Sequence, residues 1–142
     1  MLLVVFGVAL VCIGAFFMFL RPPLLPEDMR SIGVSPEQLQ AALPRMASWL
    51  LRVFQVLGGY AMASGVLTVT IAATSFRRYE RMALVGVLAA GAASIGWMVV
   101  VNFAIGSDFR WVLLAVAILW AASVCMFVVE LRQAAVHAGE VG

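Results

Sequence analysis

The sequence predicts an all-α protein: a four-helix transmembrane bundle of up-down-up-down topology, with a short amphipathic helix in the first loop. Hydrophobic residues make up 65% of the 142 residues and charged residues only 11%, which is too few polar groups to cover a water-facing surface. Four apolar segments also reach the length of about 20 residues that a membrane-spanning helix needs. We therefore expect one integral membrane domain over residues 1–142, with helices at about 1–20, 49–76, 82–105 and 111–131 and a loop at 21–48.

The first apolar segment, residues 1–20, is expected to be a retained membrane helix and not a secretory signal. No basic residue precedes its apolar run, the run is longer than that of a usual signal, and Arg21-Pro22-Pro23 makes a poor cleavage site. These prolines, with Pro26, also stop the helix because proline lacks an amide donor and restricts the residue before it. The chain should therefore leave the membrane here.

The loop that follows contains the start of a short helix. Ser35 is the expected N-cap, Pro36 the first helical residue, and Gln38 completes a capping box. The helix is expected to reach about Ala42, with leucines along one edge that lie at the level of the lipid headgroups. Trp49 then serves as an interfacial anchor where the chain enters the membrane again.

Short connections join the remaining spans. The second and third are linked by FRRYER, and the third and fourth by GSDFRW, in which Gly106 ends one helix and Ser107 or Asp108 caps the next. Connections this short predict antiparallel neighbours. An even number of spans then places both termini on one face of the membrane.

The orientation depends on arginines, because the chain contains no lysine. The arginines are nearly balanced between the faces: Arg77, Arg78, Arg81 and Arg132 on the side of the termini, against Arg21, Arg30, Arg45, Arg52 and Arg110 on the other. The compact cluster in the short FRRYER loop favours termini in the cytoplasm. The absence of lysine and the abundance of Ala, Val and Gly indicate a bacterial protein, so we expect a multi-pass protein of a bacterial inner membrane.

Small residues predict which helices pack together. Gly59 and Ala63 are four residues apart in the second span, and the segment GVLAAGAASIG in the third repeats small residues at the same spacing. In lipid, helices approach closely over such residues. We expect the second and third helices to pack tightly, with these contributing residues: Gly59, Ala63, Gly86, Ala90, Ala93 and Gly96.

Four polar residues form the candidate site. Arg52 and Gln55 begin the second span, while Asn102 and Asp108 end the third and open the fourth, so all four arrive at the same membrane face. Polar groups at membrane depth usually find partners. We predict an Arg52–Asp108 pair with Gln55 and Asn102 bonded nearby. The group is then either a structural clasp or a polar pocket for a lipid headgroup or small anion, and a third alternative is that these residues do not meet.

Three segments also carry a resemblance: LLPEDMRSIG, RVFQVLGGYAMASGVLTV and VNFAIGSDFRW. With these segments the chain resembles small bacterial four-helix membrane proteins of unknown function, broadly the DoxX-like group. The resemblance covers most of the chain. It implies a four-helix fold and supplies no activity.

The sequence lacks the residue clusters that membrane enzymes use, so we expect no enzyme, no cofactor and no metal site. Cys12 and Cys125 lie at different membrane depths and in no CxxC motif, and His137 lies in a polar tail beyond the fourth helix. Glu130, at the edge of a span, is the only acid within one, so a proton-coupled exporter lacks its carboxylate. The basic residues form no single patch, which excludes nucleic acid as a partner.

The preferred function is a non-catalytic membrane module that acts by helix–helix association, as a homo-oligomer or as an accessory subunit of a membrane complex. The expected partners are membrane lipids and a second copy or another membrane protein. One alternative is a binder or carrier of a lipid or small hydrophobic ligand, with the four polar residues as its mouth. A second alternative is a small oligomeric channel or transporter, which the balanced arginines would permit.

Overall fold

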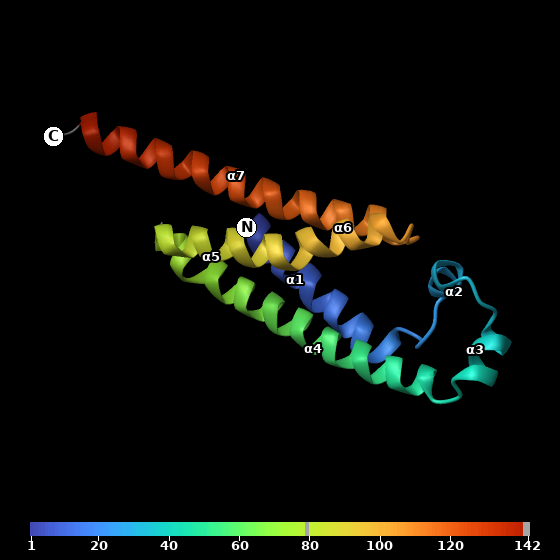
Figure 1. Cartoon of the computed structure of the whole chain (residues 1–142). Coiled ribbons are helices and arrows are strands. Elements are labelled where there is room, and N and C mark those ends of the chain that lie inside the picture. Colours follow the sequence, from blue (N-terminus) through green and yellow to red (C-terminus); the bar gives the residue numbers. More distant parts are fainter. Residues whose placement is uncertain (79, 141–142) are drawn as a thin grey trace.

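The computed structural model describes residues 1–78 and 80–140, with side chains up to Gln133, and this part of the chain is helical without strands. The elements are α1 (Leu2–Ala15) with a π-helical turn (Phe16–Leu20), α2 (Pro26–Ile32), α3 (Pro36–Ala42), α4 (Met46–Ala73) with a 3₁₀ turn (Ser75–Arg78), α5 (Arg81–Gly91), a π-helical turn (Ala92–Gly96), α6 (Trp97–Ala104) and α7 (Arg110–Glu140). Figure 1 shows the long helices side by side, with α2 and α3 at one end.

Four helical segments are long and apolar enough to cross a membrane, as predicted: Leu2–Leu20, Met46–Arg78, Arg81–Ala104 and Arg110–Gln133. The largest difference in boundaries is at the end of α7, which continues to Glu140. The expectation that His137 lies beyond the fourth helix is therefore wrong, and its side chain lies outside the described ones. The helix continues because residues 132–138 contain neither proline nor glycine.

The loop between α1 and α4 holds two helices where the sequence predicted one. The predicted capping box of α3 is confirmed, since the Gln38 amide donates to Ser35 Oγ at 3.2 Å and the Ser35 amide donates to Gln38 Oε1 at 2.9 Å. The additional helix, α2, starts at Pro26 and ends at Ile32, and the next residue, Gly33, has a left-handed φ of 76°. Pro26 was interpreted only as a helix breaker, yet proline equally suits the first position of a new helix.

Glycines bring α1 and α4 into backbone contact. A Cβ built on Gly14 would lie 2.5 Å from the Met62 amide nitrogen, and one built on Gly65 would lie 2.6 Å from the Gly7 carbonyl oxygen. Gly7 therefore lies against Gly65, and Gly14 against Gly58, which makes the two helices antiparallel. On each helix the two glycines are seven residues apart, which is about two helical turns. One face of each helix is therefore clear of side chains at both contacts.

The predicted packing of the second helix on the third is wrong. A Cβ on Gly59 or on Gly86 would meet nothing within 4 Å, and the only neighbour recorded for Gly96 is the Gly91 carbonyl of its own helix at 3.5 Å. The alanines of the predicted face, Ala63, Ala90 and Ala93, are exposed. The face of α4 that packs is the neighbouring one with Gly58 and Gly65, because α1 supplies glycines at matching spacing.

A core of large apolar side chains joins α1, α5 and α7. Phe6 and Ile95 are almost wholly buried in it, together with Leu3, Leu10, Val87, Leu113 and Val124. Trp120 of α7 lies against Gly91 of α5 and donates from Nε1 to the Val87 carbonyl at 3.2 Å. The third span therefore pairs with α7, and the two helix pairs meet through this core.

Candidate functional site: a polar clasp at the loop end

The structure does not bring together the four predicted site residues. Arg52 Nη1 donates to Gln55 Oε1 at 3.0 Å, so these two bond with each other on α4. Asn102 Nδ2 donates to the Met98 carbonyl of its own helix at 2.8 Å. Asp108 accepts hydrogen bonds from Arg30 at 2.9 and 3.0 Å. The predicted Arg52–Asp108 pair is therefore wrong, because α2 lies over the 106–109 turn and supplies a nearer cation.

A different polar cluster forms at the end of the bundle where α2 lies. We call it the α2 clasp, and it consists of Arg21, Glu27, Asp28, Arg30, Ser107 and Asp108. Three of its members come from the short helix α2, which holds its own N-terminus through Asp28: Oδ2 accepts from the Leu25 amide at 2.8 Å. Acidic residues in the first turn also suit the positive end of the helix dipole.

Arg21 ties the end of the first span to α2. Its Nη2 donates to both carboxylate oxygens of Asp28, at 3.0 and 3.3 Å, and its Nη1 donates to the Pro22 carbonyl at 3.0 Å. The guanidinium also stacks on the Phe54 ring of α4, with 3.5 Å between Cζ and the ring centroid. Arg21 is 8% exposed, so this pair is shielded from water.

Glu27 binds the turn between α6 and α7. Its carboxylate accepts from Ser107 Oγ at 3.2 Å and from the Asp108 amide at 2.7 Å. Ser107 is completely buried, and its Oγ in turn accepts from the Phe109 amide at 3.1 Å. Gly106, with φ of 66°, ends the third span as predicted and turns the chain into this contact.

The Arg30–Asp108 pair closes the outer edge of the clasp. The hydrogen bonds to Asp108, with the attraction of its charge, hold the pKa of the Arg30 guanidinium above its ordinary value. Both side chains are more than half exposed, at 58% and 68%. Water and salt therefore screen this pair, and it contributes little to stability.

The polar atoms of the clasp bind one another. Among the described residues, every buried side-chain nitrogen or oxygen has a hydrogen-bond partner, and no group of three potential metal ligands gathers. These contacts hold α2 against the end of the first span and against the 106–109 turn. The sequence did not predict these members of the site: Arg21, Glu27, Asp28, Arg30 and Ser107, of which Ser107 was expected only as a possible helix cap. The dense charges of PEDMR, directly after the first apolar segment, were a signal.

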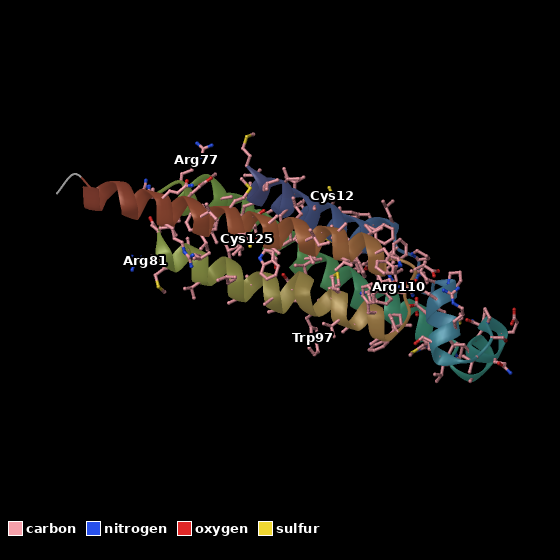
Figure 2. The ribbon with its side chains drawn as sticks, turned by 90° about the horizontal axis from the view of Figure 1, so that it is seen from above. Cys12, Arg77, Arg81, Trp97, Arg110 and Cys125 are labelled. Atoms are coloured by element: carbon pink, nitrogen blue, oxygen red, sulfur yellow. The ribbon has the colours of Figure 1, made fainter. Side chains whose placement is uncertain are left out.

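Other polar and reactive residues lie away from the clasp. Cys12 and Cys125 are free thiols on different helices. Figure 2 shows both on the ribbon, and it places Arg77 and Arg81 at the end of the bundle opposite to Arg110. The charged ends of the bundle are therefore distinct, with the clasp at one and Arg77 and Arg81 at the other.

Comparison of the chain with protein-family models, with curated proteins and with solved structures finds no match in any of the three.

Glu27→Gln should loosen the clasp without changing its shape. The amide keeps one oxygen but loses the charge that strengthens the bonds from Ser107 and the Asp108 amide, so we expect a loss of about 1–2 kcal/mol in the free energy of unfolding. Hydrogen exchange at the Asp108 amide should become faster. The matched control is Glu37→Gln, at an exposed acid outside the clasp, and equal effects of both variants would contradict this role for Glu27.

Proposed function

We propose that this chain is a non-catalytic integral membrane protein that acts by helix–helix association, with a second copy of itself or with another membrane protein. The observation that carries the proposal is the exposure of the small residues on α4, on α5 and on the π-helical turn that follows α5. Gly59 and Gly86 have open space where a Cβ would lie, and Ala63, Ala90 and Ala93 are exposed. In lipid, faces of this kind favour close approach of another helix.

The internal packing of the chain supports this interpretation. Gly7, Gly14, Gly58 and Gly65 are already used between α1 and α4, where backbone touches backbone. The glycines at 59 and 86 serve no such contact within the described chain. Glycine weakens a helix by about 1 kcal/mol relative to alanine. An intermolecular contact would compensate for this weakness.

The proposal includes a topology and a location. The four apolar segments cross the membrane up-down-up-down in a bacterial inner membrane, and both termini lie in the cytoplasm. Antiparallel contacts between α1 and α4 support the alternating directions, as does the Phe103–Trp111 contact with ring centroids 5.2 Å apart. The three arginines of the FRRYER turn support the orientation. The resemblance to DoxX-like proteins stays a prediction.

Chemical crosslinking and native mass spectrometry in a mild detergent test the association. The wild-type protein should give oligomers, or a complex with another chain when it is purified from membranes. Gly59→Leu combined with Gly86→Leu should reduce the amount of the oligomer or of the complex by about tenfold. The built Cβ positions are free, so both leucines fit the folded chain. Val8→Leu and Val129→Leu, at exposed positions on α1 and α7, form the control pair.

Two results would remove the proposal. One is a wild-type protein that is monomeric at every concentration and purifies without another membrane chain. The other is an oligomer that is equally abundant in the glycine variants and in the control pair, since it would then form through another surface.

A further inference from the structure

The elbow where α3 passes into α4, residues 42–57, carries positive charge without any negative charge beside it in sequence. No acidic residue lies between Glu37 and Glu80. Arg45 and Arg52 are both exposed, and neither forms an ion pair within the described residues. The only partner recorded for the Arg52 guanidinium is the neutral Gln55 amide. By contrast, Arg21 and Arg30 at the same end of the bundle are neutralised by the carboxylates of the α2 clasp.

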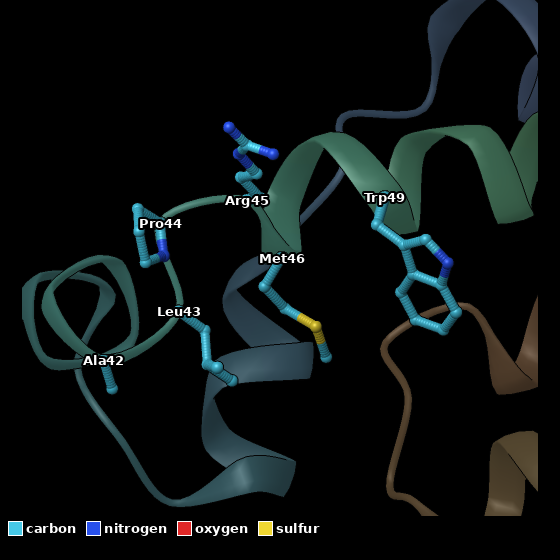
Figure 3. Close-up of a pocket in the computed structure, with 6 residues that line it drawn as sticks. All are labelled: Ala42, Leu43, Pro44, Arg45, Met46 and Trp49. Atoms are coloured by element: carbon cyan, nitrogen blue, oxygen red, sulfur yellow. The ribbon is translucent and has the colours of Figure 1, made fainter.

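The same elbow presents an apolar groove. Leu43, Met46 and Trp49 line a shallow depression of about 360 Å³, with Ala42, Pro44 and Arg45 at its edges. Figure 3 shows the side chains of Leu43, Met46 and Trp49 on one side of the chain and the Arg45 guanidinium on the other. A second open groove of about 280 Å³ follows along α4 and is lined by Arg52, Val53, Val56 and Leu57.

The length of α4 places this elbow among lipid headgroups. A helix of 28 residues is about 42 Å long, whereas the hydrocarbon core of a bilayer is about 30 Å thick. With its C-terminal end at one boundary, the first eight or so residues of α4, about 46–53, extend into the headgroup layer of the other. Trp49 belongs at that level, and it is 58% exposed. Arg52 lies one turn deeper, at the inner edge of the same layer, where its guanidinium bonds Gln55.

We propose that the α3–α4 elbow binds an anionic phospholipid. Arg45 and Arg52 bind the headgroup phosphate from two depths. Along the helix axis, Arg45 lies about 6 Å from Trp49 toward the water, and Arg52 lies about 4.5 Å from Trp49 toward the membrane centre. The acyl chains then pass down the groove over Val56 and Leu57. A guanidinium has five N–H donors, so Arg52 keeps donors for a phosphate while it bonds Gln55. This inference goes beyond the proposed function, because it uses none of the exposed small residues.

The charges and the groove together identify the occupant. A free anion would satisfy the arginines but leave the apolar groove empty, whereas a zwitterionic lipid would fill the groove and bring its own cation beside them. Only a lipid with net negative charge matches both features. Arginine near a membrane surface increases affinity for anionic lipids several-fold per residue.

The test uses the full chain in nanodiscs of phosphatidylglycerol and phosphatidylcholine in equal parts, followed by native mass spectrometry of the lipids that stay bound. The wild-type protein should retain phosphatidylglycerol preferentially. Arg45→Gln combined with Arg52→Gln should lower that preference by about tenfold. Arg77→Gln combined with Arg78→Gln is the matched control, because it removes the same charge at the FRRYER end and should leave most of the preference.

Three outcomes would overturn the proposal: a wild-type protein without preference for phosphatidylglycerol, an elbow variant that retains the preference, or equal losses in the elbow and FRRYER variants, which would indicate general attraction to an anionic membrane. The first is independent of whether any variant folds. Arg45→Lys combined with Arg52→Lys, which keeps the charge, should retain most of the preference and confirms that the loss is electrostatic. Crosslinked oligomers should persist in the elbow variant, so this test can fail while the proposed association stands.

Discussion

Gly14→Val is expected to disrupt the pairing of α1 with α4. Its Cβ would lie 2.5 Å from the Met62 amide nitrogen and 2.6 Å from the Gly58 carbonyl oxygen, and both of these atoms belong to backbone that cannot rotate away. The helices must separate along their whole contact, so we expect a loss of at least about 3 kcal/mol in the free energy of unfolding. Unfolding in mixed micelles with increasing denaturing detergent measures the change.

The matched control is Gly59→Val, one position from the glycine that faces Gly14. Its Cβ would meet nothing within 4 Å, and valine has a higher helix propensity than glycine. This variant should therefore be as stable as the wild type, when both are measured at low protein concentration so that association adds nothing. A Gly14→Val protein as stable as Gly59→Val would mean that α1 and α4 do not touch in this way.

Arg21→Met is expected to weaken the loop end of the bundle by about 3 kcal/mol, because it removes the ion pair with Asp28 and the stacking on Phe54 together. The side chains of Arg21 and Asp28 are only 7% and 20% exposed, so water replaces the lost partner poorly. Thermal unfolding in detergent measures the loss. Arg30→Met is the control at an exposed pair and should have a much smaller effect.

A double-mutant cycle separates the ion pair from the stacking. Asp28→Asn keeps an oxygen that accepts the Leu25 amide, so it removes charge while it preserves the start of α2. The coupling between Arg21→Met and Asp28→Asn should be at least about 1 kcal/mol. Independent effects of the two substitutions would show that Arg21 acts only through Phe54 and the Pro22 carbonyl.

Local features of the sequence predicted the four long helices and α3. Continuous apolar runs predict spans because a backbone in lipid must satisfy its own hydrogen bonds. The capping box of Ser35 and Gln38 and the turn at Gly106 are equally local, since each depends on residues within four positions. Helix α2 was missed for a local reason as well, because the same proline that stops one helix can start another.

The partners of the polar residues were not predictable in this way. Glu27 and Arg30 bind residues about 80 positions later in the chain, Ser107 and Asp108. Asp108 lies at the end of the bundle where α2 and its arginine Arg30 also lie, and several other arginines are near that end. Which of them reaches Asp108 depends on where the loop folds back, and hydropathy contains no information on that.

The sequence by itself determined the number, the apolar character and the approximate ends of the long helices, because these follow from periodicity and breakers within each segment. Tertiary structure alone decided which faces meet. Gly58 and Gly59 are adjacent and chemically identical, yet one is pressed against α1 and the other lies open. A rotation of about 100° per residue separates their directions, and only the position of a neighbouring helix selects between them.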